Sequence, residues 1–152
     1  MIRKMQEKDC PAVAQLWREH LNISTATDES VRRTFEIMSE DSRYCTYVAE
    51  ADGMVVGFIT YVEVLSFDDP DGYVKINGIA VLPAYRKQGI AQELTKRVEQ
   101  DAYNRGANSI GVASRFQRTG SHNMLDKLGY QKAAFWFHKN LLPPEEETRS
   151  NG

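Results

Sequence analysis

Residues 73–91 read YVKINGIAVLPAYRKQGIA, and they hold the junction around which the rest of the chain is organised. The apolar and β-branched residues from Tyr73 to Leu82 predict a strand. Pro83 ends it, because proline has no N–H to donate to a ladder. The residues from Gln88 to Asn104 predict a long helix, with an apolar face made by Ile90, Leu94, Val98 and Ala102. A strand therefore passes through a short bend directly into a helix.

The bend from Arg86 to Ala91 is a predicted anion site. A helix N-terminus has unpaired backbone N–H groups and partial positive charge. Gly89 has no side chain, so a phosphate can approach the backbone there, and Arg86 and Lys87 add cationic donors. The spacing matches neither GxxxxGK[ST] nor GxGxxG. A pyrophosphate is the expected ligand, and the alternative is a capped turn that binds nothing.

The segments on either side of the bend predict alternating helices and strands. Upstream there are three strands and two helices, and downstream a short strand, a helix ended by Gly129 and a last strand rich in aromatic residues. Hairpins mixed with helical crossovers imply a mixed sheet covered by helices, of class α/β or α+β. The predicted strands are 2–5, 44–50, 54–65, 73–82, 109–114 and 130–138, and the predicted helices are 9–21, 28–40, 88–104 and 119–128.

Two further features lie between or on these elements. The segment 66–72 is expected to be an acidic loop, because Pro70 removes a donor and its Asp and Gly residues favour turns. Trp17 falls on the apolar face of the first helix and is interpreted as a core residue.

Length and composition limit the range of functions. A chain of 152 residues with 41% hydrophobic residues predicts one domain, residues 1–142, and a polar, acidic tail, 143–152, expected to be disordered. A net charge of -2 does not suggest a nucleic-acid partner. The sequence has neither an 18-residue apolar run nor an apolar leader, so a cytoplasmic protein without a membrane partner is expected. Cys10 and Cys45 lack metal-ligand spacing, so no metal is expected.

The stretch around the bend resembles the signature of the GNAT superfamily of N-acetyltransferases. Its core is Arg/Gln-x-x-Gly-x-Gly/Ala, and this chain reads Arg86-x-x-Gly89-x-Ala91 after a strand ending in Val-x-Pro. The segment Ser121 to Tyr130 resembles the family's Ala-His-x-Phe-Tyr-x-x-x-Gly-Phe segment, and Val48 to Gly57 is similar to its early hairpin. The resemblance covers roughly residues 1 to 140. It implies a twisted mixed sheet of six to seven strands, flanked by about four helices in a single domain.

The resemblance also implies a binding site for acetyl-CoA. Its pantetheine arm would lie between the splayed fourth and fifth strands, along the backbone of Ile79, Ala80 and Val81. The backbone amides of the bend would hold the pyrophosphate. The residues implied for it are Arg86, Lys87, Gln88, Gly89, Ile90, Ala91 and Gln92, with Arg118 and Asn123 as additional contacts.

The usual catalytic residues of the family are missing. Asn77 and Ala113 stand where a strand glutamate acts as base, and Leu125 stands where a tyrosine protonates the thiolate. Two candidates remain for the base: His122, whose ordinary pKa suits proton transfer at neutral pH, and Glu63 on the third strand. Each has an alternative as a surface residue without a catalytic role.

The expected function is transfer of an acetyl group from acetyl-CoA to a primary amine of a small molecule, protein or peptide. Direct attack in a ternary complex is expected, because neither cysteine is placed to carry the acyl group. The alternative is a catalytically silent CoA-binding sensor or interaction module. If Asp68, Asp69 and Asp71 line the acceptor pocket, they favour a cationic acceptor, whereas an ordinary solvated turn implies nothing. The sequence leaves both a monomer and a homodimer open.

Overall fold

The computed structural model describes residues 1–113 and 119–141, and within them one mixed sheet has five strands in the order β1-β2-β3-β4-β5. Neighbouring strands are antiparallel except for β4 and β5, which are parallel. The mixed sheet expected from the sequence is confirmed, although the expected six to seven strands are not. The strands are β1 (Ile2–Lys4), β2 (Tyr44–Ala51), β3 (Met54–Ser66), β4 (Asp69–Val81) and β5 (Ser109–Val112).

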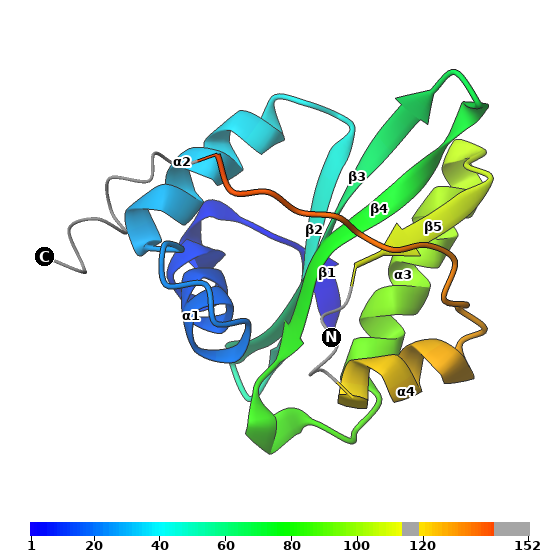
Figure 1. Ribbon diagram of the computed structural model, residues 1–152. Coiled ribbons are helices and arrows are strands. Elements are labelled where there is room, and N and C mark those ends of the chain that lie inside the picture. Colours follow the sequence, from blue (N-terminus) through cyan, green and yellow to red (C-terminus); the bar gives the residue numbers. More distant parts are fainter. Residues whose placement is uncertain (114–118, 142–152) are drawn as a thin grey trace, which may run out of the picture.

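Four α-helices in the described residues cover the sheet in two groups (Figure 1). The helices α1 (Cys10–His20) and α2 (Asp28–Ser39) pack together beside one face, and α3 (Ile90–Arg105) lies against the other, with α4 (Thr119–Lys127) near its N-terminal end. Short 3-10 turns, η1 (Glu7–Asp9) and η2 (Pro83–Tyr85), precede α1 and α3. The fold is a single α+β domain.

The hydrophobic core has one part on each face of the sheet. On the α3 side, the helix buries Leu94, Val98 and Ala102 against β-strand residues that include Ile59 and Val74. This is the helix face that the sequence predicts. On the opposite side, α1 packs on β2, β3 and β4 through a smaller cluster: Val13, Leu16, Leu21, Val48, Phe58 and Ala80.

The hairpin of β3 and β4 is longer than the sequence predicts. Pairing continues to Ser66 and Asp69, so only Phe67 and Asp68 lie between the strands. A bulge between Val64 and Ser66 lets the ladder pass the region of Pro70. The expected loop 66–72 is therefore wrong, and its acidic residues lie at the tip of a projecting hairpin (Figure 1).

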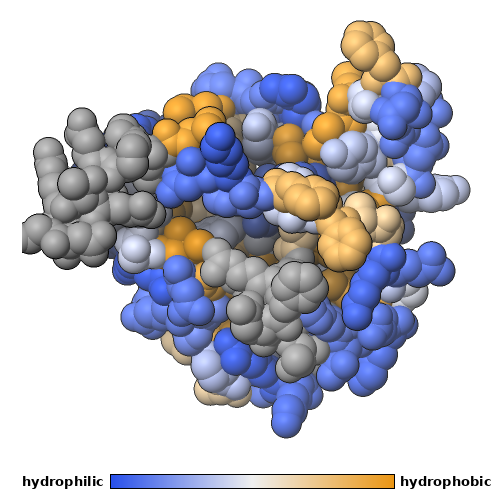
Figure 2. All heavy atoms as spheres, viewed as in Figure 1, coloured by the Kyte–Doolittle hydropathy of each residue, from blue (hydrophilic) through white to orange (hydrophobic). Residues whose placement is uncertain are grey.

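The predicted last strand, 130–138, is also wrong. The structure gives no strand from Tyr130 to Leu141, and β5 has β4 as its one strand neighbour among the described residues. The segment instead runs back across β4 (Figure 1), where the Lys75 Nζ lies 4.5 Å from the centre of the Trp136 ring. Phe135 and Phe137 are mostly exposed. Figure 2 shows apolar side chains across the middle of this face and at the hairpin tip. Aromatic propensity favours a strand, but it does not supply a partner strand.

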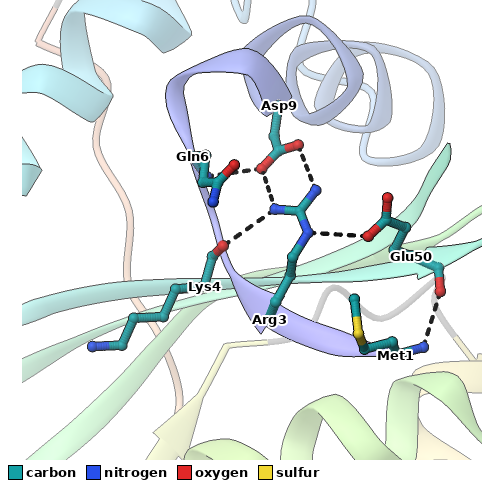
Figure 3. Close-up of polar contacts among 6 residues, drawn as sticks. All are labelled: Met1, Arg3, Lys4, Gln6, Asp9 and Glu50. Carbon is teal, nitrogen blue, oxygen red and sulfur yellow. Dashed lines mark hydrogen bonds and ion pairs between the residues drawn. The ribbon is translucent and has the colours of Figure 1, made fainter. Parts of the chain in front are cut away.

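A polar network ties the N-terminal strand to the turn before α1 (Figure 3). The Arg3 guanidinium donates two hydrogen bonds to the Asp9 carboxylate, at 2.7 and 2.9 Å, and a third to Glu50 at 3.2 Å. The backbone N–H of Gln6 donates to Asp9 as well, at 2.8 Å. Burial of the Asp9 carboxylate opposes its ionisation, but these donors outweigh the burial and lower the pKa of Asp9. Asp9, which is 3% exposed, therefore holds β1 and α1 together as an anion.

We expect Asp9→Asn to lower the free energy of unfolding by about 3 kcal/mol at pH 7, because it leaves the partly buried Arg3 without the nearer of its two carboxylate partners. Since folding lowers the Asp9 pKa, the wild-type advantage exists above the ordinary aspartate pKa of 3.8 and disappears as the pH falls through the lower folded value. Chemical denaturation between pH 3 and 7 measures this difference. The control is Asp41→Asn, because Asp41 is in an exposed ion pair with Arg43. This substitution should leave the denaturant concentration at the unfolding midpoint almost unchanged. An Asp9→Asn penalty that does not shrink below about pH 4 contradicts the account.

Candidate active site

The strand β4 leaves regular pairing at Asn77. Thr60 of β3 pairs with Gly78 and Tyr61 pairs with Ile76, so Asn77 is the extra residue of a β-bulge. On the other side, parallel pairing with β5 ends where Ile76 meets Val112. From Asn77 onward, the edge of β4 that faces β5 has no ladder partner among the described residues. The parallel pairing therefore ends at the point where β4 is bulged.

A small cavity of about 40 Å³ lies where this pairing ends. Its wall includes Trp17 of α1 and Leu21, which directly follows that helix, and α4 contributes Met124 and Leu125. Thr95 of α3 also lines it, but its hydroxyl already donates to the Ala91 carbonyl at 2.8 Å. The remaining wall comes from β4 and β5. Side chains from both faces of the sheet thus meet in one cavity, because the opening between β4 and β5 joins the two faces.

At three positions the sequence lacks the catalytic side chain that the family usually has, and these three positions meet in this cavity. Asn77 of the bulge, Ala113 just after β5 and Leu125 of α4 all line it. None of them titrates near neutral pH. The three positions that the resemblance assigns to the acid and base thus lie in one cavity wall, and none of them has an ionisable side chain.

Trp17 and Gly78 fit together across the cavity wall. A Cβ atom built on Gly78 would lie 2.5 Å from Cζ2 of Trp17, far inside van der Waals contact. The Trp17 ring also packs on Phe58, with ring centroids 5.3 Å apart. Trp17 is therefore a core residue, as the sequence predicts, and also a cavity wall, which the sequence analysis missed. The available signal was Gly78 itself, because a glycine within a strand often marks a close approach.

The bend between β4 and α3 has the geometry of an anion site. Gly89 is the N-cap of α3 with φ of 82°, and Lys87 has φ of 63°, so two residues of the bend are in the left-handed region. Glu93 makes the first bond of the helix, to the Gly89 carbonyl. In the part of the chain that the structure describes, the N–H groups of Ile90, Ala91 and Gln92 have neither a backbone nor a side-chain acceptor. These groups and the helix dipole are available to an anion.

The cationic side chains of the bend differ in their roles. The Arg86 Nε donates to the Val81 carbonyl at 2.9 Å, which fixes the end of β4 against the bend. Lys87 is exposed, as are Gln88 and Gly89. The Lys87 ammonium and the free backbone N–H groups thus lie together in solvent just beyond the end of β4.

Other predicted cofactor contacts lie at the edges of this region. Ile79, Ala80 and Val81 pair with β3 on one side and border the opening on the other. Gln92 lines an open groove of about 610 Å³ between α3 and α4, beside Lys96 and Lys127. Asn123 is exposed on α4 next to the cavity residue Met124. Arg118 lies outside the described residues.

The two catalytic candidates have different surroundings. The Glu63 carboxylate accepts a hydrogen bond from Arg105 at 2.8 Å, an ion pair between β3 and α3, and Glu63 is not part of the cavity wall. His122 lies on α4, half-buried, one helical turn before Leu125. It is not a lining residue either. Of the two, His122 alone lies on an element that forms the cavity.

The acidic residues of the hairpin tip are not brought to the cavity. Asp69 accepts a hydrogen bond from the Asn108 side chain at 2.7 Å, beside the start of β5. The cavity lies at the other end of β5, after Val112.

Comparisons with known proteins show the family to which the chain belongs. The model of the acetyltransferase (GNAT) family matches residues 10–130, and the chain belongs to that family. It is an enzyme of the N-acetyltransferase class. An aminoglycoside N(6')-acetyltransferase type 1 from Salmonella typhimurium is 26% identical over 121 residues, which cover 78% of this chain and 79% of the relative.

Solved structures show the same fold at low identity. A transcriptional regulator from Bacillus halodurans is 19% identical and has a TM-score of 0.81, with 93% of this chain and 99% of that chain covered. An aminoglycoside N-acetyltransferase in complex with CoA is 23% identical with a TM-score of 0.76, over 93% of this chain and 94% of that chain.

Two kinds of feature are absent from the described residues. No helix among them is both long and apolar enough to cross a membrane. Nor do they contain a cluster of three His, Cys, Asp or Glu side chains that could hold a metal ion.

We expect Gly78→Ala to displace Trp17 from the cavity wall, because both cannot occupy the same space. Overpacking of this kind costs about 1–3 kcal/mol, which corresponds to a fall in Tm of about 5 °C for a chain of this size. Thermal unfolding measures the loss, and the Trp17 fluorescence of a Trp136→Phe background reports the displacement. The matched control is Gly111→Ala in β5, where an added Cβ meets nothing within 4 Å. Equal effects of the two substitutions contradict the proposed packing.

Proposed function

We propose that this enzyme transfers the acetyl group of acetyl-CoA to a primary amine of a small molecule, protein or peptide. The observation that carries the proposal is the junction of two features: the opening between β4 and β5, and the free N–H groups at the start of α3. Each feature fits a different part of CoA. Their order along β4 matches the order of pantetheine and pyrophosphate in the molecule.

The residues of the bend fit the pyrophosphate. The N–H groups from Lys87 to Gln92 donate to its oxygens, and the Lys87 ammonium adds charge. Gly89 keeps its backbone accessible, since a Cβ there has open space around it in the structure. Along the unpaired edge from Ile79 to Val81, backbone carbonyls accept hydrogen bonds from the amides of the pantetheine arm, and backbone N–H groups donate to them. Arg86 supports the site by holding the end of β4 in place.

The proposed reaction is a direct attack in a ternary complex. The neutral amine nitrogen forms a bond to the thioester carbonyl carbon, the carbon–sulfur bond breaks, and the sulfur leaves as a thiolate that takes up a proton. The cysteines do not suit a covalent step. Cys10 is fully buried, and burial raises the pKa of its thiol, while neither cysteine lines the cavity.

The proton of the attacking amine needs an acceptor, and His122 is the proposed one. It lies one turn before the cavity residue Leu125 on α4, so a water molecule between the imidazole and the cavity would complete the path. The ion pair of Glu63 with Arg105 gives that carboxylate a structural role instead. The aminoglycoside acetyltransferases among the relatives support an acceptor that is a small-molecule amine.

We expect Gly89→Val to weaken CoA binding by at least about tenfold, because a β-branched residue is strained in the left-handed region and covers the free N–H groups. Calorimetric titration of CoA measures the change. Gly53→Val is a matched control, since Gly53 has φ of 77° and nothing within 4 Å of its Cβ, but lies in the β2–β3 turn. Normal CoA affinity in a folded Gly89→Val protein would contradict the position proposed for the pyrophosphate.

We expect wild-type protein to release free thiol from acetyl-CoA in the presence of an amine, and His122→Ala to slow this release about 10²-fold with little change in CoA affinity. Following thiol release over a panel of primary amines tests both statements. An unchanged rate in His122→Ala removes histidine as the base. CoA binding without thiol release across the panel contradicts the proposed transfer and favours the alternative of a CoA-binding module.

A further inference from the structure

The cavity at the β4 bulge has no ionisable side chain among the described residues that line it. Its wall is mainly apolar, and Thr95 already donates its hydroxyl proton to the Ala91 carbonyl. The Asn77 carboxamide is the polar side chain that is left to contact a ligand. Asn77 itself is exposed, so a cationic group that passes it into the cavity gives up part of its hydration shell for one neutral amide, which is unfavourable for more than a single, neutralised amine.

A positive charge lies two residues before the bulge on β4. Val74 and Ile76 pack against the α3 side, so Lys75, which lies between them, points to the opposite face of the sheet. The Lys75 ammonium is held over the Trp136 ring, with its Nζ 4.5 Å from the ring centroid. A multiply charged acceptor that approaches Asn77 over this face therefore meets a like charge rather than a carboxylate.

The acidic groups that could attract a cation are engaged elsewhere. Asp69 is hydrogen-bonded to Asn108 at the far end of β5, and Glu63 pairs with Arg105 on the α3 side. Neither group is part of the cavity wall. Neither the acidic hairpin residue Asp69 nor the candidate base Glu63 thus supplies a carboxylate to the bulge.

Trp17 supplies a surface for an apolar group. Its indole is fixed between Gly78 and Phe58, so the ring is already ordered before a ligand arrives. An aromatic or branched aliphatic body gains by burial against such a rigid wall. Leu21 extends the same wall along α1.

We infer that the acceptor of this enzyme is a monoamine carried on an apolar, aromatic or branched aliphatic body, and not a polycation. This inference rests on the proposed function and names the substrate class of that same site. The apolar body packs on Trp17, and the Asn77 carboxamide oxygen accepts a hydrogen bond from the amine nitrogen. Lys75 disfavours acceptors with further positive charges.

Binding can be measured without turnover. In a Trp136→Phe protein, Trp17 is the one remaining tryptophan, and its fluorescence reports ligands in the cavity. With the protein saturated with CoA, we expect phenethylamine to change this fluorescence with a Kd at least about tenfold below that of spermidine or kanamycin. Equal or tighter binding of the polycations overturns the inference, and so does the absence of a response to any amine.

Substitutions at the bulge test the cause of the preference. We expect Asn77→Asp to reduce or reverse the preference for phenethylamine over spermidine, because it adds a carboxylate to the cavity. Lys75→Gln should change the ratio of the Kd values for phenethylamine and spermidine in the same direction, by a smaller factor. The matched control is Asn104→Asp, the same chemical change on the exposed side of α3, which should leave the ratio unchanged. A ratio that Asn77→Asp does not alter overturns the assignment of Asn77.

The inference and the proposed function fail in different ways. Failure of the function is seen as acetyl-CoA that releases no thiol with any amine. Failure of the inference is seen in the order of the binding constants, which are measured with CoA. Where thiol is released, the same order should hold for kcat/KM.

Discussion

The end of the pairing between β4 and β5 is the constraint on which the rest of the site depends. The bulge of β4 at Asn77 coincides with the last parallel pair, Ile76 and Val112. The bulge turns β4 away while β3 holds its other edge, so the unpaired edge faces an opening and not solvent alone. The same strand then ends at Pro83 and leads into α3, which places free N–H groups a short distance beyond the opening.

The packing of the two faces keeps this arrangement in place. Leu94 and Val98 hold α3 against the sheet from one side, and α1 packs on β3 and β4 from the other. The packing of the core on both faces therefore supports the opening. Trp17 connects the two functions of α1, because it packs on Phe58 as a core residue and closes the cavity above Gly78.

Much of this architecture could be predicted from the sequence, since local signals there agree with the tertiary structure. Periodicity predicted α3 and its buried face, and the bend predicted a helix start with free N–H groups, which follows Gly89 in the structure. The predicted strand at 130–138 failed because propensity describes a residue's preference and not the availability of a partner strand. The cavity residues Trp17 and Thr95 could not be found by motif, because they come from different helices and meet only in the folded chain.

The proposed site combines strong cofactor geometry with weak catalytic chemistry. Asn77, Ala113 and Leu125 leave proton transfer to a group at the edge of the cavity, so binding and orientation must supply much of the rate. The most direct measurement of the central claim is amide hydrogen exchange on the wild-type chain with and without saturating CoA. The account predicts slower exchange at residues 77–81 and 87–92, with no change at the β2–β3 turn. Unchanged exchange at both segments, with protection elsewhere, would contradict it.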